Sequence, residues 1–319
     1  MTIFVALLAG LAVALLLPRR RAAIPRPAFI AAQATLGVML GTYLQSSSLS
    51  ALAGDWLPVA VVSVATLALS VAAGLLLTRT TQVDGPTGTL GMVAGGASGI
   101  VAMADELDAD VRLVAFMQYL RVLVVVLTIP VVVAFGFPGA ERGVEVDDGP
   151  LFAGAGDWVL TVAVAFIGGW AGRRTRLPAA TLLGPLLLAG AIALLATDAL
   201  TVPPLAREVA FALIGLEVGL RFTAETLRAM GRLLGPVVLA IVALMAGSFL
   251  FAIGLTATTS ASLLESYLAT TPGGLYAVLA VAFSAGADTT FVVGVQTLRL
   301  LSLVILAPFV VRWVVRRVA

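Results

Sequence analysis

The sequence lacks both histidine and cysteine across its 319 residues. Without them it can form no disulfide, and it has no thiolate or imidazole to bind zinc, copper, haem or an iron–sulfur cluster. No Walker loop, nucleophile elbow or carboxylate cluster with metal-ligand spacing is apparent either. We therefore expect no catalytic residue, no metal site and no cofactor, and we do not expect an enzyme.

Charge is scarce as well. Only 11% of the residues are charged and 61% are hydrophobic, with a mean hydropathy of +1.10, whereas a soluble domain is near half apolar and a quarter charged. A chain this apolar cannot hide its side chains inside one globule, so the lipid bilayer is its expected partner. All basic residues are arginine, and the net charge of +2 is spread over loop ends, which predicts no nucleic-acid surface. The sequence predicts an all-α, polytopic membrane protein.

Apolar runs predict about nine spanning helices, because crossing about 30 Å of hydrocarbon takes about 20 residues. The runs cover residues 2–17, 28–45, 57–78, 111–135, 157–172, 178–197, 205–222, 233–256 and 289–315. Arginines follow the first run rather than precede it, which favours a membrane helix over a signal peptide. Two further apolar runs, 87–106 and 264–284, each contain a Gly-Gly pair.

The two halves of the chain align at a single offset. Asp110 and Asp288 differ by 178 positions, and the same shift brings other uncommon residues together. It places Gly95 and Gly96 on Gly273 and Gly274, Gln118 on Gln296, and Arg121 on Arg299. We interpret this as a duplication, with repeat one at 1–140, an acidic external loop at 141–156 and repeat two at 157–319. The run at 157–172 has no counterpart, so repeat one is expected to lack its first helix.

The positions of the arginines decide between two topologies. If both Gly-Gly runs span the membrane, the arginine clusters fall on opposite sides, against the positive-inside tendency. If each Gly-Gly run enters and leaves on one side, the clusters all become cytoplasmic and the two repeats are inverted. The Gly-Gly pair at 95–96 lies near the middle of its run, as a turn at the bilayer midplane requires. We therefore predict two re-entrant hairpins that meet at the midplane, as in inverted-repeat transporters.

The tips of these hairpins are the first candidates for substrate binding, because glycine lets backbone groups approach a ligand closely. Close packing of helices through small residues is the alternative. The tip residues are Gly95, Gly96, Ser98 and Gly99 in the first hairpin, and Thr271, Pro272, Gly273, Gly274 and Tyr276 in the second.

Arg121 and Arg299 are the second candidates, together with Gln118 and Gln296 three positions earlier. Each arginine is eleven residues into its expected helix, about 16 Å deep. An arginine at that depth costs at least about 2.5–3.5 kcal/mol and normally faces a partner or a wet cavity. It could bind an anionic substrate, or it could hydrogen-bond the carbonyl groups where the hairpin breaks a helix.

Three carboxylates are candidates for ion coupling: Asp110, Asp288 and Glu217. The alternative for Asp110 and Asp288 is an N-cap, since each precedes an expected helix. Glu217 could pair with an arginine, and its role would be asymmetric because Met39 occupies the equivalent position.

The segments "DELDADVRLVAFMQYLRVLVVV" and "GADTTFVVGVQTLRLLSLVILAP" resemble the AbrB-duplication family of bacterial membrane proteins, and "LPAATLLGPLLLAG" is similar to the start of that family's second helix. Members are often labelled ammonia monooxygenases or AbrB-family regulators. The absence of histidine and cysteine argues against a monooxygenase, and the chain does not resemble the soluble DNA-binding protein that shares the regulator name.

More distantly, five spans and a Gly-Gly hairpin per repeat are similar to the glutamate–sodium and citrate–sodium symporters. That similarity implies transport by a homodimer. We therefore expect a secondary-transporter-like protein of the bacterial inner membrane that moves a small solute, an anion or carboxylate, with ion coupling. The alternative is a membrane-embedded sensor or regulatory protein that affects gene expression through a partner.

Overall fold

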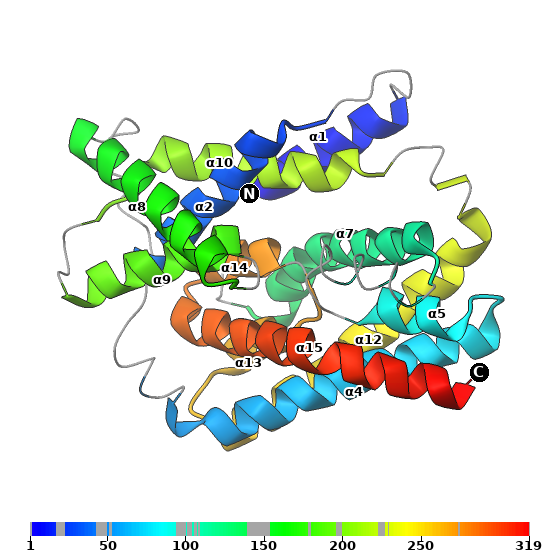
Figure 1. Cartoon of the computed structure of the whole chain (residues 1–319). Coiled ribbons are helices and arrows are strands. Elements are labelled where there is room, and N and C mark those ends of the chain that lie inside the picture. The colour runs from blue at the N-terminus through cyan, green and yellow to red at the C-terminus, as the bar shows by residue number, and fades with distance from the viewer. Residues whose placement is uncertain are drawn as a thin grey trace. The chain divides into compact units, whose positions relative to one another are not determined.

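The computed structural model describes residues 2–318, except for 17–22, 43–49, 51–52, 94–99, 101–103, 105–106, 108, 139–153, 178–179, 196–199, 223–226, 229 and 274. Over this part the protein has twelve helices and no strand (Figure 1).

Four helices are long and apolar enough to cross a membrane. They are α4 (Trp56–Thr80), α7 (Val111–Gly136), α8 (Ala155–Arg174) and α12 (Gly231–Thr258). The shorter apolar helices are α1 (Thr2–Leu16), α9 (Ala180–Leu195) and α14 (Leu275–Ser284). Large apolar side chains such as Leu16, Phe135 and Phe166 are more than two-thirds exposed. Such surfaces suit lipid rather than water, so the chain is that of a membrane-associated protein.

Helix boundaries recur at the offset of the polar residues. The remaining helices are α2 (Arg26–Thr42), α5 (Gly85–Met92), α10 (Pro204–Leu220), α13 (Leu263–Thr270) and α15 (Thr289–Val318). Helices α2 and α10 begin 178 positions apart, at residues 26 and 204. The same difference separates both ends of α5 from those of α13, and the starts of α7 and α15.

The chain forms two compact units, and each takes segments from both halves of the sequence. Unit 1 comprises residues 1–50, 139–223 and 282–290. Unit 2 comprises residues 51–138, 224–281 and 291–319. Both short helices α5 and α13, and the positions of Arg121 and Arg299, belong to unit 2.

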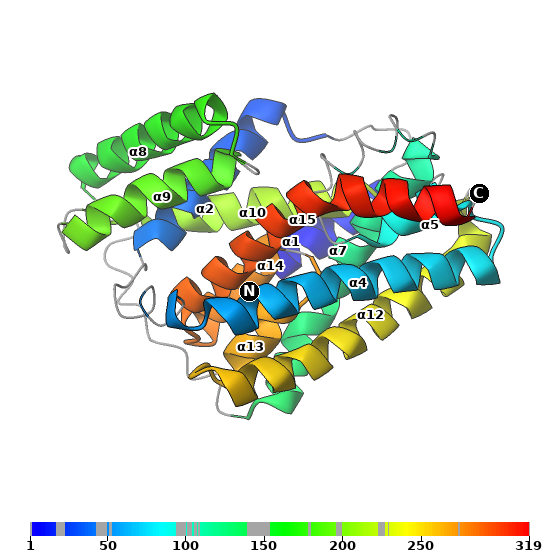
Figure 2. The same cartoon turned by 60° about the horizontal axis from the view of Figure 1, so that its bottom comes forward.

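In unit 1, helices from opposite halves of the sequence pack in pairs. Helix α1 packs on α10, and α2 packs on α9 (Figure 1). Glycines allow the helix backbones to touch: a Cβ atom on Gly215 would lie 2.1 Å from the carbonyl oxygen of Ile3, and one on Gly37 would lie 2.3 Å from that of Leu182. This is the small-residue packing of membrane helices. Helix α8 packs beside α9 (Figure 2).

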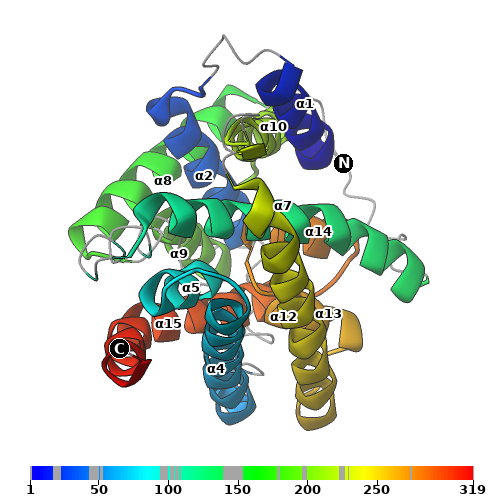
Figure 3. The same ribbon diagram turned by 90° about the vertical axis from the view of Figure 1, so that its right-hand side faces the viewer.

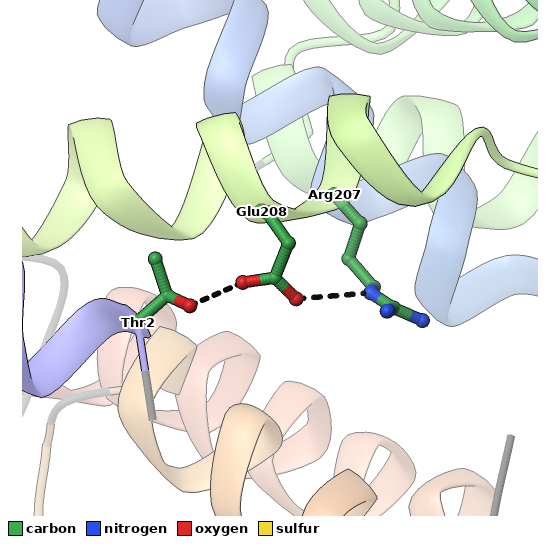
Figure 4. Close-up of polar contacts among 3 residues, drawn as sticks. All are labelled: Thr2, Arg207 and Glu208. Atoms are coloured by element: carbon green, nitrogen blue, oxygen red, sulfur yellow. Dashed lines mark hydrogen bonds and ion pairs between the residues drawn. The ribbon is translucent and has the colours of Figure 1, made fainter. Parts of the chain in front are cut away.

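A polar cluster joins α1 to α10 in the same unit (Figure 4). The hydroxyl of Thr2 donates a hydrogen bond to Glu208, whose other carboxylate oxygen lies 3.4 Å from Nε of Arg207. The Arg207 guanidinium also lies 5.8 Å from the centre of the Phe283 ring. The contacts hold the N-terminal end of α1 against the first two turns of α10.

Unit 2 is built around α4 and α12, which run side by side (Figures 2 and 3). Helix α5 packs on α4 and α7, and α13 packs on α12. Glycine again sets the spacing, because a Cβ atom on Gly74 of α4 would lie 2.7 Å from the carbonyl oxygen of Gly88 in α5. The tight contact holds the C-terminal end of α5 where α7 can reach it.

Candidate functional site

Two short helices stop inside unit 2. Helices α5 and α13 have eight residues each, about 12 Å, which is less than half of the hydrocarbon thickness. Each has a side-chain cap at its start: Asp84 accepts from the amide of Thr87 at 2.8 Å, and Ser262 forms a capping box with Glu265. Their last carbonyl groups have no partner within the helix, and these carbonyls are where the candidate site begins.

The first clamp, Gln118 and Arg121 of α7, binds the end of α5. Nε2 of Gln118 donates to the carbonyl oxygens of Leu90 at 2.7 Å and Val93 at 2.9 Å. Nη1 of Arg121 donates to Met92 at 3.1 Å and to Val93 at 3.0 Å. Nη2 of Arg121 donates to Oε1 of Gln118 at 2.7 Å, which couples the two side chains.

The second clamp, Gln296 and Arg299 of α15, repeats these contacts at the end of α13. Nε2 of Gln296 donates to the carbonyl oxygen of Leu268 at 2.9 Å, and Nη1 of Arg299 donates to Thr270 at 3.0 Å and to Thr271 at 2.7 Å. Nη2 of Arg299 donates to Oε1 of Gln296. Every one of these donors and acceptors lies 178 positions after its counterpart in the first clamp.

Both arginines therefore hydrogen-bond carbonyl groups at a helix end, which was one of the two roles that the sequence allowed for them. They supply donors to carbonyl groups that a helix end leaves unpaired. All four clamp side chains are buried, with Arg121 2% exposed and Arg299 5% exposed.

The two guanidinium groups carry positive charge, and no carboxylate among the described residues forms an ion pair with either of them. Arg207 with Glu208 and Arg221 with Glu217 are examples of arginines in the described part that do have a carboxylate partner. Two positive charges buried within one unit repel each other. Carbonyl dipoles offset part of this cost, but a buried positive charge still favours an anion nearby.

Gly273 brings the second tip against the first clamp. Its φ of +105° lies in the region that glycine tolerates. A Cβ atom at this position would lie 2.9 Å from Nε of Arg121 and 3.6 Å from both Cζ and Nη2. Segments from both halves of the sequence thus meet at one guanidinium group.

The predicted tip residues are only partly visible. Gly95, Gly96, Ser98, Gly99 and Gly274 lie outside the described residues. Thr271 and Pro272 are buried, and the hydroxyl of Thr271 donates to the carbonyl oxygen of Tyr267 at 2.7 Å. Tyr276 is partly buried in the first turn of α14.

The structure describes each of the three predicted coupling carboxylates within its own unit. Asp110 is exposed and caps α7, accepting from the amides of Arg112 at 2.9 Å and Leu113 at 3.0 Å. Glu217 accepts from Arg221 at 2.5 Å, one turn along its own helix. Asp288 is half-buried just before α15, and it belongs with Glu217 to unit 1.

Sequence reasoning missed the caps at Asp84 and Ser262. The signal was present as Ser262 followed three residues later by Glu265, ahead of an apolar run. It also missed the contact between Gly91 and Met117, in which a Cβ atom would lie 2.4 Å from the methionine sulfur. That contact brings α5 close enough for the first clamp to reach its carbonyl groups.

Comparison with known proteins gives one consistent result. The family described as "Transition state regulatory protein AbrB" matches residues 3–315. "Putative regulator AbrB" of Escherichia coli (strain K12) is 37% identical over 293 residues, covering 91% of this chain and 84% of that protein. The uncharacterized protein YhjN of Bacillus subtilis (strain 168) is 29% identical over 291 residues, covering 86% of this chain and 76% of that protein. No solved structure matches.

Proposed function

The chain belongs to the AbrB family, and from that premise we propose that it is a multi-pass inner-membrane protein of the secondary-transporter type. It moves a small anion or carboxylate with ion coupling. The observation that carries the proposal is the pair of short helices in unit 2, each ending at a buried glutamine–arginine clamp.

Broken helices support transport because non-helical backbone inside a membrane is tolerated only where protein or a wet cavity surrounds it. Transporters with inverted repeats place such breaks at the bilayer midplane, where the substrate binds. Under the proposal, nine helices span the membrane and the two hairpins enter from opposite faces. The segment between α13 and α14, Thr271 to Gly273, is the described example of such a break.

The clamps support an anionic substrate. Two arginines are buried in one compact unit without a carboxylate partner in the described part. A bound carboxylate would reduce the repulsion between them and would be held by the same groups that hold the helix ends. Both tips, both glutamines and both arginines make up the proposed binding site.

Ion coupling and assembly complete the proposal. Asp110, Asp288 and Glu217 are the carboxylates proposed to bind the coupling ion, and the active form is proposed to be a homodimer. Asp110 joins the start of α7, the helix of the first clamp, to α5, because its amide donates to the Thr87 hydroxyl at 2.8 Å. Thr87 lies in the first turn of α5.

A second function is favoured by the name of a relative. The protein of Escherichia coli is called a regulator. A membrane-embedded sensor could use the same site to hold a solute as a signal and pass it to a partner protein that controls gene expression. A sensor and a transporter differ in flux: both bind the solute, and only the transporter moves it.

Single cysteines test the proposed topology, and the chain has no native cysteine to interfere. The substitutions Gln82→Cys and Arg112→Cys flank the first hairpin, and Ser260→Cys and Ser284→Cys flank the second. A membrane-impermeant maleimide is expected to label the first two only from the cytoplasm and the second two only from outside. Labelling of Gln82→Cys and Arg112→Cys from opposite sides would mean that the run spans, and would exclude inverted repeats.

Proteoliposomes test the function itself. Vesicles with the purified protein are expected to accumulate a radiolabelled carboxylate, from a panel of acetate, lactate, succinate and glutamate, when a sodium or proton gradient is imposed. Arg121→Lys keeps the charge but loses the planar fork, and uptake should fall at least tenfold. Arg112→Lys, an exposed arginine on the same helix, is the matched control. Binding of a solute without gradient-driven uptake would favour the sensor.

A further inference from the structure

Helix α8 of unit 1 has one face packed against α9 and another face that is exposed. On the packed face, a Cβ atom on Gly168 would lie 2.5 Å from Cα of Pro185, and one on Gly172 would lie 2.7 Å from the carbonyl oxygen of Ala180. The exposed face carries six large apolar side chains, each at least 45% exposed: Val159, Leu160, Val162, Phe166, Ile167 and Trp170. In a helix long and apolar enough to cross a membrane, such a face suits acyl chains.

Two arginines follow Trp170 at the C-terminal end of this face. Successive residues of an α-helix are turned by about 100°, so Arg173 lies about 60° to one side of Trp170 and Arg174 about 40° to the other. Both arginines are exposed. A Cβ atom on Gly169 would lie 3.7 Å from Nη1 of Arg173, so this guanidinium group folds back to the level of the Trp170 turn. The apolar face therefore ends in an indole and two guanidinium groups, which are side chains typical of the headgroup level of a bilayer.

Arg176 adds a third exposed guanidinium group, in a backbone conformation that favours glycine. Its φ is +57°, and no other residue of the described part except glycine has a positive φ. Its amide donates to the carbonyl oxygen of Arg173 at 3.2 Å, and the amide of Leu177 donates to that of Gly172 at 2.9 Å. This is the Schellman arrangement, in which glycine usually occupies the position of Arg176. An arginine there strains the backbone, and what it supplies that glycine cannot is positive charge.

We infer that the C-terminal end of α8 binds the phosphate of an anionic phospholipid, whose acyl chains lie along the exposed face of the helix. The two free oxygens of a phosphodiester match the planar fork of a guanidinium group. Between Asp157 and Asp198 the sequence has no acidic residue, so no neighbour in this stretch neutralises the three arginines. The same charges repel the ammonium group of a zwitterionic choline lipid. The inference needs α8 to span the membrane, as the proposed topology has it, but it does not depend on transport.

A second copy of the chain is the other occupant that an exposed apolar face could have. Both copies of a dimer insert in the same direction, so a two-fold axis would be perpendicular to the bilayer and two facing α8 helices would run in parallel. The arginines of both copies would then meet at the same end and repel each other. A phospholipid brings the opposite charge to that end, so the arginines favour a lipid on this face.

Native mass spectrometry of the purified protein in detergent tests the inference by titration with dioleoyl phosphatidylglycerol or dioleoyl phosphatidylcholine. The wild type should bind phosphatidylglycerol at least fivefold more tightly. One arginine near an anionic lipid surface contributes about fivefold in affinity, so Arg173→Gln combined with Arg174→Gln should weaken binding of phosphatidylglycerol at least fivefold. Arg79→Gln combined with Arg112→Gln removes the same charge from exposed positions of unit 2 and should leave the affinity within twofold. Equal affinity of the wild type for both lipids, or equal losses in both double variants, would overturn the inference.

The substitution Arg176→Gly separates lipid binding from the stability of the helix end. Glycine relieves the strained backbone, so the melting temperature in lipid-free detergent should not fall, whereas the affinity for phosphatidylglycerol should fall at least twofold. A lower melting temperature together with a lower affinity would show that Arg176 holds the helix end and would remove it from the lipid site. An unchanged affinity would remove it as well.

Two further measurements distinguish the lipid from other occupants. Inorganic phosphate should not displace phosphatidylglycerol, because it has no acyl chains, and displacement would show a site for free phosphate instead. On oxidation, Phe166→Cys should form a disulfide between copies no faster than Leu239→Cys, which replaces another exposed apolar residue. A faster reaction of Phe166→Cys would place a second copy on this face and overturn the inference.

The proposed function is judged separately by uptake. Uptake that is the same in vesicles with and without phosphatidylglycerol leaves transport standing, and the titration alone then decides on the lipid site. Selective binding of phosphatidylglycerol without uptake of any carboxylate leaves the lipid site standing in a protein that is not a transporter.

Discussion

The first and second clamps make matching hydrogen bonds at positions that differ throughout by 178, yet they end differently. In the first, Nε of Arg121 is buried without an acceptor in the described part, and Gly273 from the other half of the chain covers it. In the second clamp, no atom of Arg299 is buried without a hydrogen-bond partner among the described residues. The contacts that the two clamps share hold the ends of the short helices, and the first clamp alone has a buried nitrogen without an acceptor among the described residues.

The largest expected effect comes from removing the shared part. Arg121→Met and Arg299→Met each leave two buried acceptors without the arginine donor, at about 1–3 kcal/mol per group. These acceptors are one carbonyl oxygen, of Met92 or Thr270, and Oε1 of the neighbouring glutamine. Each variant should lose about 2–5 kcal/mol of stability, measured by unfolding in mixed micelles with increasing SDS.

The decreases in unfolding free energy of the two variants should agree within about 1 kcal/mol, because the contacts of the two clamps correspond one to one. Such agreement would show that the two clamps hold their helix ends equally. Arg112→Met removes an exposed arginine of α7 and should change stability by no more than about 0.5 kcal/mol. If Arg121→Met were as stable as the wild type, the first clamp would not hold α5, and the two clamps would not have the same structural role.

A smaller effect is expected at the start of the two short helices. Asp84→Ala and Ser262→Ala remove equivalent N-caps, and loss of a cap costs about 0.5–2 kcal/mol. The same unfolding assay should place both variants between Arg121→Met and the wild type. Ser260→Ala, an exposed serine two residues before the second cap, is the control. If only one of the two caps mattered, the short helices would be anchored in different ways.

Much of the helical layout could be predicted from the sequence. The runs 57–78, 111–135 and 233–256 correspond to α4, α7 and α12, because a continuous apolar stretch of that length has few alternatives to a membrane helix. The apolar run 264–284 is divided at Thr271–Gly273, where proline and glycine interrupt it. Gln118 stands three positions before Arg121, a spacing that brings two side chains together on a helix, and the two hydrogen-bond each other.

The acceptors of the clamps could not be predicted. Arg121 binds carbonyl groups 28 and 29 residues earlier in the chain, and those groups are in reach only because α5 packs tightly against α7. Every residue has a carbonyl group, so no sequence pattern marks the ones that are left unpaired. The division into two units could not be predicted either. The pattern of apolar residues shows which side chains are to be buried, but it does not show which helix of the other half they pack against.

The pairing of α1 with α10 and of α2 with α9 bears on how the protein is made. Helix α1 ends at residue 16 and its partner begins at residue 204. At 5–20 residues per second, synthesis of the intervening chain takes roughly 10–40 s. During that time the glycine-lined faces of α1 and α2 have no partner in the membrane. Final assembly of unit 1 therefore waits for the second half to emerge, and factors that shield half-made membrane proteins would act in that interval.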